Sequence, residues 1–196
     1  PAQRSRNILD AAEKFYEVRA YKLAELKFVE AQQAYESNRL TNNINYSKVF
    51  ADQGLLYATM GRLNLAYQYT TEALDMRERS LGKNSKAYAA SLNNNAVLAQ
   101  DMARYNEAEK LFQEALATVK KTLGEHSQEY AIGLNNEAIF FSKVGRYDQA
   151  IERLKSAIAI LESKDGNSKN AIGFQSNLAL LYQKTGKLSE AETIYL

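Results

Sequence analysis

The chain of 196 residues has no cysteine and no tryptophan, and it has only one proline and one histidine. The lack of cysteine excludes disulfide bridges and thiolate chemistry. The single histidine, His126, leaves no histidine pair for a metal and no Ser-His-Asp set for nucleophilic catalysis. We therefore expect a protein that is not an enzyme and that has no catalytic, metal-binding or cofactor-binding residues.

The chain also lacks an excess of one charge and a long apolar run. Lys and Arg number 25 against 23 Asp and Glu, and the two signs are interleaved along the chain. No basic stripe indicates a nucleic-acid partner. No apolar run approaches the roughly 20 residues of a membrane helix, so we expect no membrane insertion. A soluble protein is expected, with the cytoplasm slightly favoured over the periplasm or secretion.

Instead, the sequence has an internal repeat. Four short turn segments are spaced 42, 42 and 41 residues apart: Gly61-Arg62-Leu63, Ala103-Arg104-Tyr105, Gly145-Arg146-Tyr147 and Gly186-Lys187-Leu188. Small residues keep the same spacing in two series, Gly54, Ala96, Ala138 and Ala179, and Ala66, Ala108, Ala150 and Ala191. Such a period predicts stacked copies of one supersecondary unit.

Apolar residues within each copy have helical spacing, which predicts two helices per repeat. We expect first helices near 5–18, 45–59, 85–101, 127–143 and 168–184, and second helices near 21–37, 63–79, 105–121, 147–162 and from 188. Candidate N-caps are Asn84 or Ser85, Ser127, and Asn167 or Ser168. Glycine in the turns supplies the positive φ that a helix end requires, and Ala103 departs from this at an energetic cost.

The order of small, aromatic and turn residues resembles the tetratricopeptide repeat. The matching residues are Gly54, Tyr57, Gly61, Ala66 and Ala73, then Ala96, Ala99, Ala103, Ala108 and Ala115, then Ala138, Phe141, Gly145, Ala150 and Ala157. The 42-residue spacing and the Leu-Asn-Asn of the first helix resemble the kinesin-light-chain variant of this repeat. Ala99 stands at the aromatic position, which is a departure from the family pattern.

The resemblance implies an all-α fold, a right-handed superhelical solenoid of antiparallel helix hairpins with about four and a half repeats. We expect one domain over 1–196, with repeats at about 3–42, 43–84, 85–126, 127–167 and a truncated 168–196. Because the chain begins at Pro1 and stops inside an amphipathic pattern, we expect a fragment of a longer protein. The resemblance also implies that the first helices line a concave groove in which a partner segment lies.

Asparagine recurs on the expected groove face. Asn94, Asn136 and Asn177 are spaced 42 and 41 residues apart, with Asp52 one period before them. An asparagine side chain can bond a peptide N–H and C=O together, so this series predicts contacts with the main chain of a protein or peptide ligand. The alternative is that these amides bond neighbouring repeats and fix their stacking.

Charges near the asparagines suggest a polarity. The early part of this face is acidic and the late part basic, with Arg6 and Lys48 interrupting the trend. The acidic residues are Asp10, Glu13, Glu17 and Asp52, and the basic ones are Lys143 and Lys184. A partner of opposite polarity is the hypothesis, and an ordinary solvated helix face is the alternative.

The leading functional hypothesis is a noncatalytic protein-interaction module with a scaffold or adaptor role. One alternative is a regulatory or sensor region of a larger enzyme or signalling protein. Another is self-assembly as a homo-oligomer through the truncated last repeat, by an apolar edge along Leu178, Leu181, Ile194 and Tyr195. The carboxylate clamp of some tetratricopeptide domains requires Lys and Arg where this chain has Ala90, Ile132, Gly173 and Asn136, so the resemblance disfavours that mode.

Overall fold

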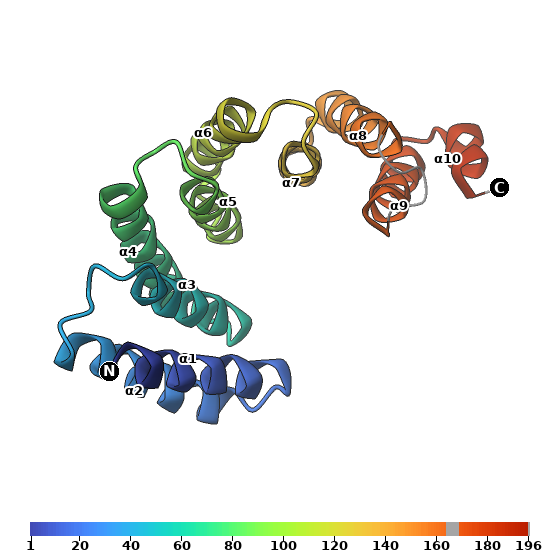
Figure 1. The fold of residues 1–196 in the computed structure, drawn as a ribbon. Helices are drawn as coiled ribbons and strands as arrows, with labels where there is room; N and C mark the ends of the chain where they lie inside the picture. Colours follow the sequence, from blue (N-terminus) through green and yellow to red (C-terminus); the bar gives the residue numbers. More distant parts are fainter. Residues whose placement is uncertain (164–168, 196) are drawn as a thin grey trace. The chain divides into compact units, whose positions relative to one another are not determined.

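The computed structural model describes residues 1–163 and 169–195, and in this part of the chain the regular structure is entirely helical (Figure 1). The helices are α1 (Ala2–Glu17), α2 (Tyr21–Ser37), α3 (Ile44–Thr59), α4 (Leu63–Leu81), α5 (Lys86–Asp101), α6 (Tyr105–Leu123), α7 (Gln128–Lys143), α8 (Tyr147–Glu162), α9 (Lys169–Lys184) and α10 (Leu188–Tyr195). None of these helices is long and apolar enough to cross a membrane. The expected all-α fold of alternating first and second helices is confirmed.

The helices form two compact units, Pro1–Arg104 and Tyr105–Leu196. In the first unit α1 packs on α2 and α3 on α4, while α2 with α3 and α4 with α5 join the successive pairs. In the second unit α7 packs on α8 and α9 on α10, and the pairs α6 with α7 and α8 with α9 are also in contact. Each unit is therefore built from helices that pack in chain order, as stacked hairpins require.

The turns inside the hairpins share one geometry. Gly61, Gly145 and Gly186 have positive φ, and Ala103 adopts the same conformation at φ 58° although it has a Cβ. The residue after each of them donates its N–H to the carbonyl five residues earlier, for example Arg146 to Phe141 at 2.8 Å. This pattern satisfies the last carbonyls of the helix and is the reason that the turn needs a left-handed residue.

Serine caps begin two of the first helices. The Ser85 hydroxyl accepts the N–H of Tyr88, and the Ser127 hydroxyl accepts the N–H of Tyr130. Both predicted caps are confirmed, whereas the cap expected at Asn167 or Ser168 lies outside the described residues. Asn43 caps α3 by accepting the N–H of Asn45, which the sequence analysis did not predict.

The repeated small residues lie in the cores of the hairpins. Ala66, Ala108 and Ala150 are fully buried. Gly54 shows why the position is small, because a Cβ placed there would lie 2.4 Å from Cγ2 of Thr70 on α4 and 3.2 Å from the carbonyl oxygen of Ala66. The spacing of small residues therefore predicted the close approach of α3 and α4 correctly.

The arginine of the turn ties neighbouring hairpins together. Arg62 bonds Glu25 at 3.0 Å, and Arg146 bonds Glu109 at 2.6 Å, with both pairs separated by 37 residues. The Arg146 guanidinium also lies over the Phe141 ring, 4.4 Å from its centroid. The Gly-Arg turn therefore ends one helix and also fixes the stacking.

Candidate functional site

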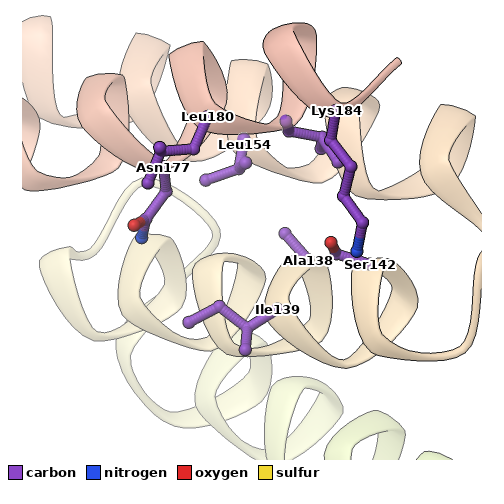
Figure 2. Close-up of a pocket in the computed structure, with 8 residues that line it drawn as sticks. Ala138, Ile139, Ser142, Leu154, Asn177, Leu180 and Lys184 are labelled. Atoms are coloured by element: carbon purple, nitrogen blue, oxygen red, sulfur yellow. The ribbon is translucent and has the colours of Figure 1, made fainter.

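A pocket of about 190 Å³ opens between α7 and α9 in the second unit. We call it the α7–α9 pocket; its lining consists of Ala138, Ile139, Ser142, Leu154, Asn177, Leu180, Leu181 and Lys184. Figure 2 shows Asn177 and Lys184 extending from α9 toward α7, with Ile139 and Ser142 facing them from α7. The pocket is thus mostly apolar, with an amide and an ammonium group at its edges.

Of the six predicted binding residues, two line this pocket and two others lie on α7 outside its lining. Asn177 and Lys184 are lining residues, whereas Asn136 is half-buried on α7 and Lys143 lies exposed at the end of that helix. Lys143 follows Ile139 by one helical turn, so it stands beside the pocket rather than in it.

Asn177 also makes a contact of the kind that stabilises stacking. Its Nδ2 donates to Oδ1 of Asn135 on α7 at 3.0 Å. Asn135 is buried, and this bond therefore satisfies a polar group that would otherwise be costly. One donor of Asn177 is consequently used within the fold, which leaves its carbonyl oxygen as the group best placed to contact a partner.

Lys184 is held above an aromatic ring. Its Nζ lies 5.0 Å from the centroid of Tyr147 on α8, while Lys155 of α8 lies 5.9 Å from the ring of Tyr182 on α9. These two reciprocal contacts join α8 to α9 and fix the position of the Lys184 ammonium. An exposed cation held in this way can still receive an anionic group.

Asp52 lies in the first unit, in a second pocket of about 220 Å³ between α1, α2 and α3. Its lining consists of Glu13, Tyr16, Glu17, Phe28, Lys48, Asp52 and Leu55. Lys48 bonds Glu13 and, at 3.2 Å, Asp52. The predicted acidic character is therefore present here, but Lys48 occupies the space between the two carboxylates.

Burial and charge shift the titration of this cluster. Burial raises the pKa of Asp52 above its usual value, and the Lys48 ammonium offsets only part of that shift. Burial lowers the pKa of Lys48, but its bonds to Glu13 and Asp52 outweigh this effect and the net shift is upward. Lys48 therefore limits the rise in the pKa of Asp52, and Asp52 helps to raise the pKa of Lys48.

The two pockets occupy the same place in the repeat. Glu13 and Ile139, like Phe28 and Leu154, are three periods of 42 residues apart, and Leu55 and Leu180 differ by two periods of 42 and one of 41. The same interface is therefore filled by an ion cluster in the first unit and left apolar in the second.

Exposed aliphatic residues on this face were missed by the sequence analysis. Leu55, Ile139 and Leu180 are 51%, 45% and 57% exposed, and each lies three residues after the Asp or Asn of the predicted series. The sequence therefore contained a signal for these residues, namely an aliphatic side chain three positions after the Asp or Asn. Exposed apolar side chains beside amides and charges are the composition expected of a protein-binding face.

A row of buried polar residues was also missed. Gln53, Asn95 and Glu137 are spaced 42 residues apart and are almost fully buried. Asn95 donates to the Thr71 hydroxyl at 3.2 Å, whereas the neighbouring Asn94 is exposed on α5, as the binding hypothesis requires. This row packs inside the repeats and is a structural feature.

Glu137 shows how such a residue is tolerated. Its carboxylate bonds Arg153 of α8 at 2.8 Å, and its side chain is only 4% exposed. Burial raises the pKa of Glu137, and Arg153 opposes that rise. The pair joins α7 to α8 and lies outside both pockets.

The apolar edge proposed for self-assembly does not form as expected. Leu178 and Leu181 are 6% and 4% exposed, because they face into the core of the second unit. Ile194 is half-buried, and the side chain of Tyr195 lies outside the described residues. The prediction of an exposed edge along Leu178 and Leu181 is therefore wrong.

Within residues 1–163 and 169–195, no group of three or more histidine, aspartate or glutamate side chains is arranged to hold a metal ion.

Comparisons with known proteins agree with the repeat. A family model described as the tetratricopeptide repeat matches residues 87–163. A search of curated proteins found no match.

Solved structures resemble the whole fold. BtubC (BKLC) from P. vanneervenii is 22% identical with a TM-score of 0.81, and the alignment covers 96% of this chain and 76% of that one. A putative kinesin light chain with nearly identical TPR-like repeats from Podospora anserina is 18% identical with a TM-score of 0.81, covering 98% and 92%. A Rap protein complexed with Competence and Sporulation Factor is 19% identical with a TM-score of 0.79, covering 96% of this chain and 51% of that one. The chain therefore carries tetratricopeptide repeats over residues 87–163, and its fold is that of the kinesin-light-chain-like repeat proteins.

Proposed function

We propose that this chain is a noncatalytic interaction module that binds a segment of a partner protein on the exposed face of its first helices. The observation that carries the proposal is the α7–α9 pocket, where exposed Ile139 and Leu180 lie beside Asn177 and Lys184. Tetratricopeptide repeats are in general protein–protein interaction modules.

The composition of the face supports a peptide ligand. Covering exposed aliphatic side chains with a partner removes apolar surface from water and is favourable. An amide can form hydrogen bonds with the main chain of the partner, and an ammonium group can bind the carboxylates of the partner. The Rap protein of similar fold is complexed with Competence and Sporulation Factor, which supports binding by this type of fold. This chain spans about half of that protein, so the support concerns the repeat fold alone.

Site-specific photo-crosslinking tests the proposal. A benzophenone amino acid is placed at Ile139 or Leu180 on the proposed face, and at Ser156 on α8 as a control, since all three positions are exposed. The expected result is one crosslinked protein, the same from Ile139 and Leu180 and absent from Ser156. Crosslinks that are equal at all three positions, or absent from both pocket positions, would contradict the proposal.

A further inference from the structure

The interior of α9 contains a glycine with open space beside it. Gly173 is exposed, and a Cβ added there would meet no atom of the described residues within 4 Å. Glycine destabilises a helix interior relative to alanine, so its presence calls for a reason.

Each of the other described glycines has either a positive φ or an atom close to where its Cβ would lie. Five of them have positive φ, namely Gly61, Gly82, Gly124, Gly145 and Gly186. In the helices, a Cβ on Gly54 would meet Thr70 at 2.4 Å, and one on Gly133 would meet Leu116 at 2.9 Å. Among the glycines in the described part of the chain, Gly173 alone has neither a positive φ nor a close neighbour.

Gly173 lies on the stripe that forms the α7–α9 pocket. Asn177, Leu180 and Lys184 follow it at four, seven and eleven residues, which places all four on one side of α9. Three of the four line the pocket. The missing side chain therefore exposes main chain at the end of a face that carries an amide, an aliphatic group and an ammonium group.

We propose that an extended segment of the partner crosses α9 with its main chain against Gly173. The partner's next main-chain N–H donates to Oδ1 of Asn177. One of the partner's aliphatic side chains enters the α7–α9 pocket beside Leu180, and one of its carboxylates lies against the Lys184 ammonium. One of the two N–H donors of Asn177 bonds Asn135 within the fold, and the proposed contact with the partner uses its Oδ1. This inference rests on the proposed function and adds the conformation and the chemistry of the ligand.

An extended ligand fits this surface better than a helical one. The side chains of a helix surround its main chain and keep it about 5 Å from a surface, whereas an extended chain can bring its main chain to a position without a Cβ. Gly173 and Leu180 are seven residues apart, or about 10 Å along α9. That distance corresponds to about three extended residues, so the recognised segment is short.

The test uses one substitution that spares the fold. Gly173→Gln adds a long polar side chain in open space and replaces glycine with a better helix former, so the Tm should stay the same or rise by about 2–4 °C. Ser156→Gln on α8 is the matched control, because Ser156 is also an exposed helical residue of the second unit.

The probe is a random dodecapeptide library displayed on phage and panned on the wild-type chain. Enriched sequences are made as free labelled peptides, and their Kd is measured with each variant. The expected peptides contain an aliphatic residue close to an acidic one. Their Kd should rise at least about tenfold with Gly173→Gln and with Lys184→Glu, and stay unchanged with Ser156→Gln.

The outcomes separate the two proposals. Enriched peptides that bind Gly173→Gln as well as wild type would overturn the path over α9 while leaving the interaction function in place. Peptides that lack acidic residues and ignore Lys184→Glu would overturn the proposed chemistry in the same way. If panning enriches no peptide and the crosslinking experiment also finds no partner, both proposals fail together.

Discussion

Gly54 gives the sharpest test of how the repeats pack, because the structure identifies the atom that excludes a side chain. In Gly54→Ala the new Cβ would lie 2.4 Å from Cγ2 of Thr70, and 3.2 Å from both the Ala66 oxygen and the Thr70 nitrogen. An ordinary contact needs at least about 3.4 Å, so Thr70 or the backbone of α4 has to move by about 1 Å. Thr70 is 4% exposed, and its hydroxyl bonds the Tyr67 carbonyl at 3.2 Å, which restricts that movement.

Two opposing terms set the magnitude. Alanine is favoured over glycine in a helix by about 1 kcal/mol, whereas overpacking a tight core costs about 1–3 kcal/mol. The difference between these terms is a loss of up to about 2 kcal/mol in the free energy of unfolding of Gly54→Ala. Urea unfolding followed by circular dichroism measures this change.

Thr70→Ser is the matched partner, because it deletes Cγ2 and keeps the hydroxyl. Alone, it removes one buried methyl group and should cost about 1 kcal/mol. In the double variant the contact between the new Cβ and Cγ2 of Thr70 no longer exists. The losses in the free energy of unfolding of the two single variants should therefore not add, and the coupling energy between the two sites should be at least about 1 kcal/mol. Strict additivity, or a Gly54→Ala variant more stable than wild type, would refute the packing explanation.

Four further predictions follow from particular residues. Ala103→Gly should raise the free energy of unfolding by about 0.5–1 kcal/mol in a urea titration, because Ala103 has φ 58°, and a loss of stability would contradict this. Arg146→Ala should lower the free energy of unfolding by about 1 kcal/mol in the same assay, because Arg146 bonds Glu109 and lies over the Phe141 ring but is partly exposed. A double-mutant cycle with Glu109→Gln should show coupling between the two residues. Lys48→Met should raise the pKa of Asp52 further in a carbon-13 NMR titration of the carboxyl group, because the neighbouring cation is removed. Since the pKa of Asp52 is already raised by folding, its contribution to stability is greatest below its unfolded pKa and falls as the pH rises through the folded pKa, and Asp52→Asn should remove that fall.

The sequence was sufficient to predict the hairpins and the caps of α5 and α7. A 42-residue period fixes which residues are equivalent, and each helix then has only one face that can be buried. Ser85 and Ser127 were found because a cap needs a short hydroxyl at one position before an apolar pattern. These features depend on local chemistry that recurs in every copy.

The binding face was harder to predict because neighbouring helical positions point about 100° apart. In Asn93-Asn94-Asn95 the middle side chain is exposed and Asn95 is buried, and only the packing of α5 on α4 decides which is which. Asn177 aligns with Asn136 in the sequence but bonds Asn135 in the structure. The repeat period alone therefore does not tell which amides bond within the fold.

The two glycines in the interiors of α3 and α9 show how the fold and the binding face can be told apart by experiment. A Cβ built on Gly54 would lie 2.4 Å from Thr70, whereas one built on Gly173 would have no neighbour within 4 Å among the described residues. Both glycines carry the same conformational cost of a glycine inside a helix. Substitution by alanine should therefore destabilise the chain at Gly54 and stabilise it at Gly173. At Gly54 the packing of Thr70 accounts for the missing side chain without any ligand. At Gly173 no contact within the described chain accounts for it, and the proposed contact with a partner's main chain supplies a reason. A Gly173→Ala variant that loses stability would show an internal reason for this glycine, and the argument for a ligand at that position would then fail.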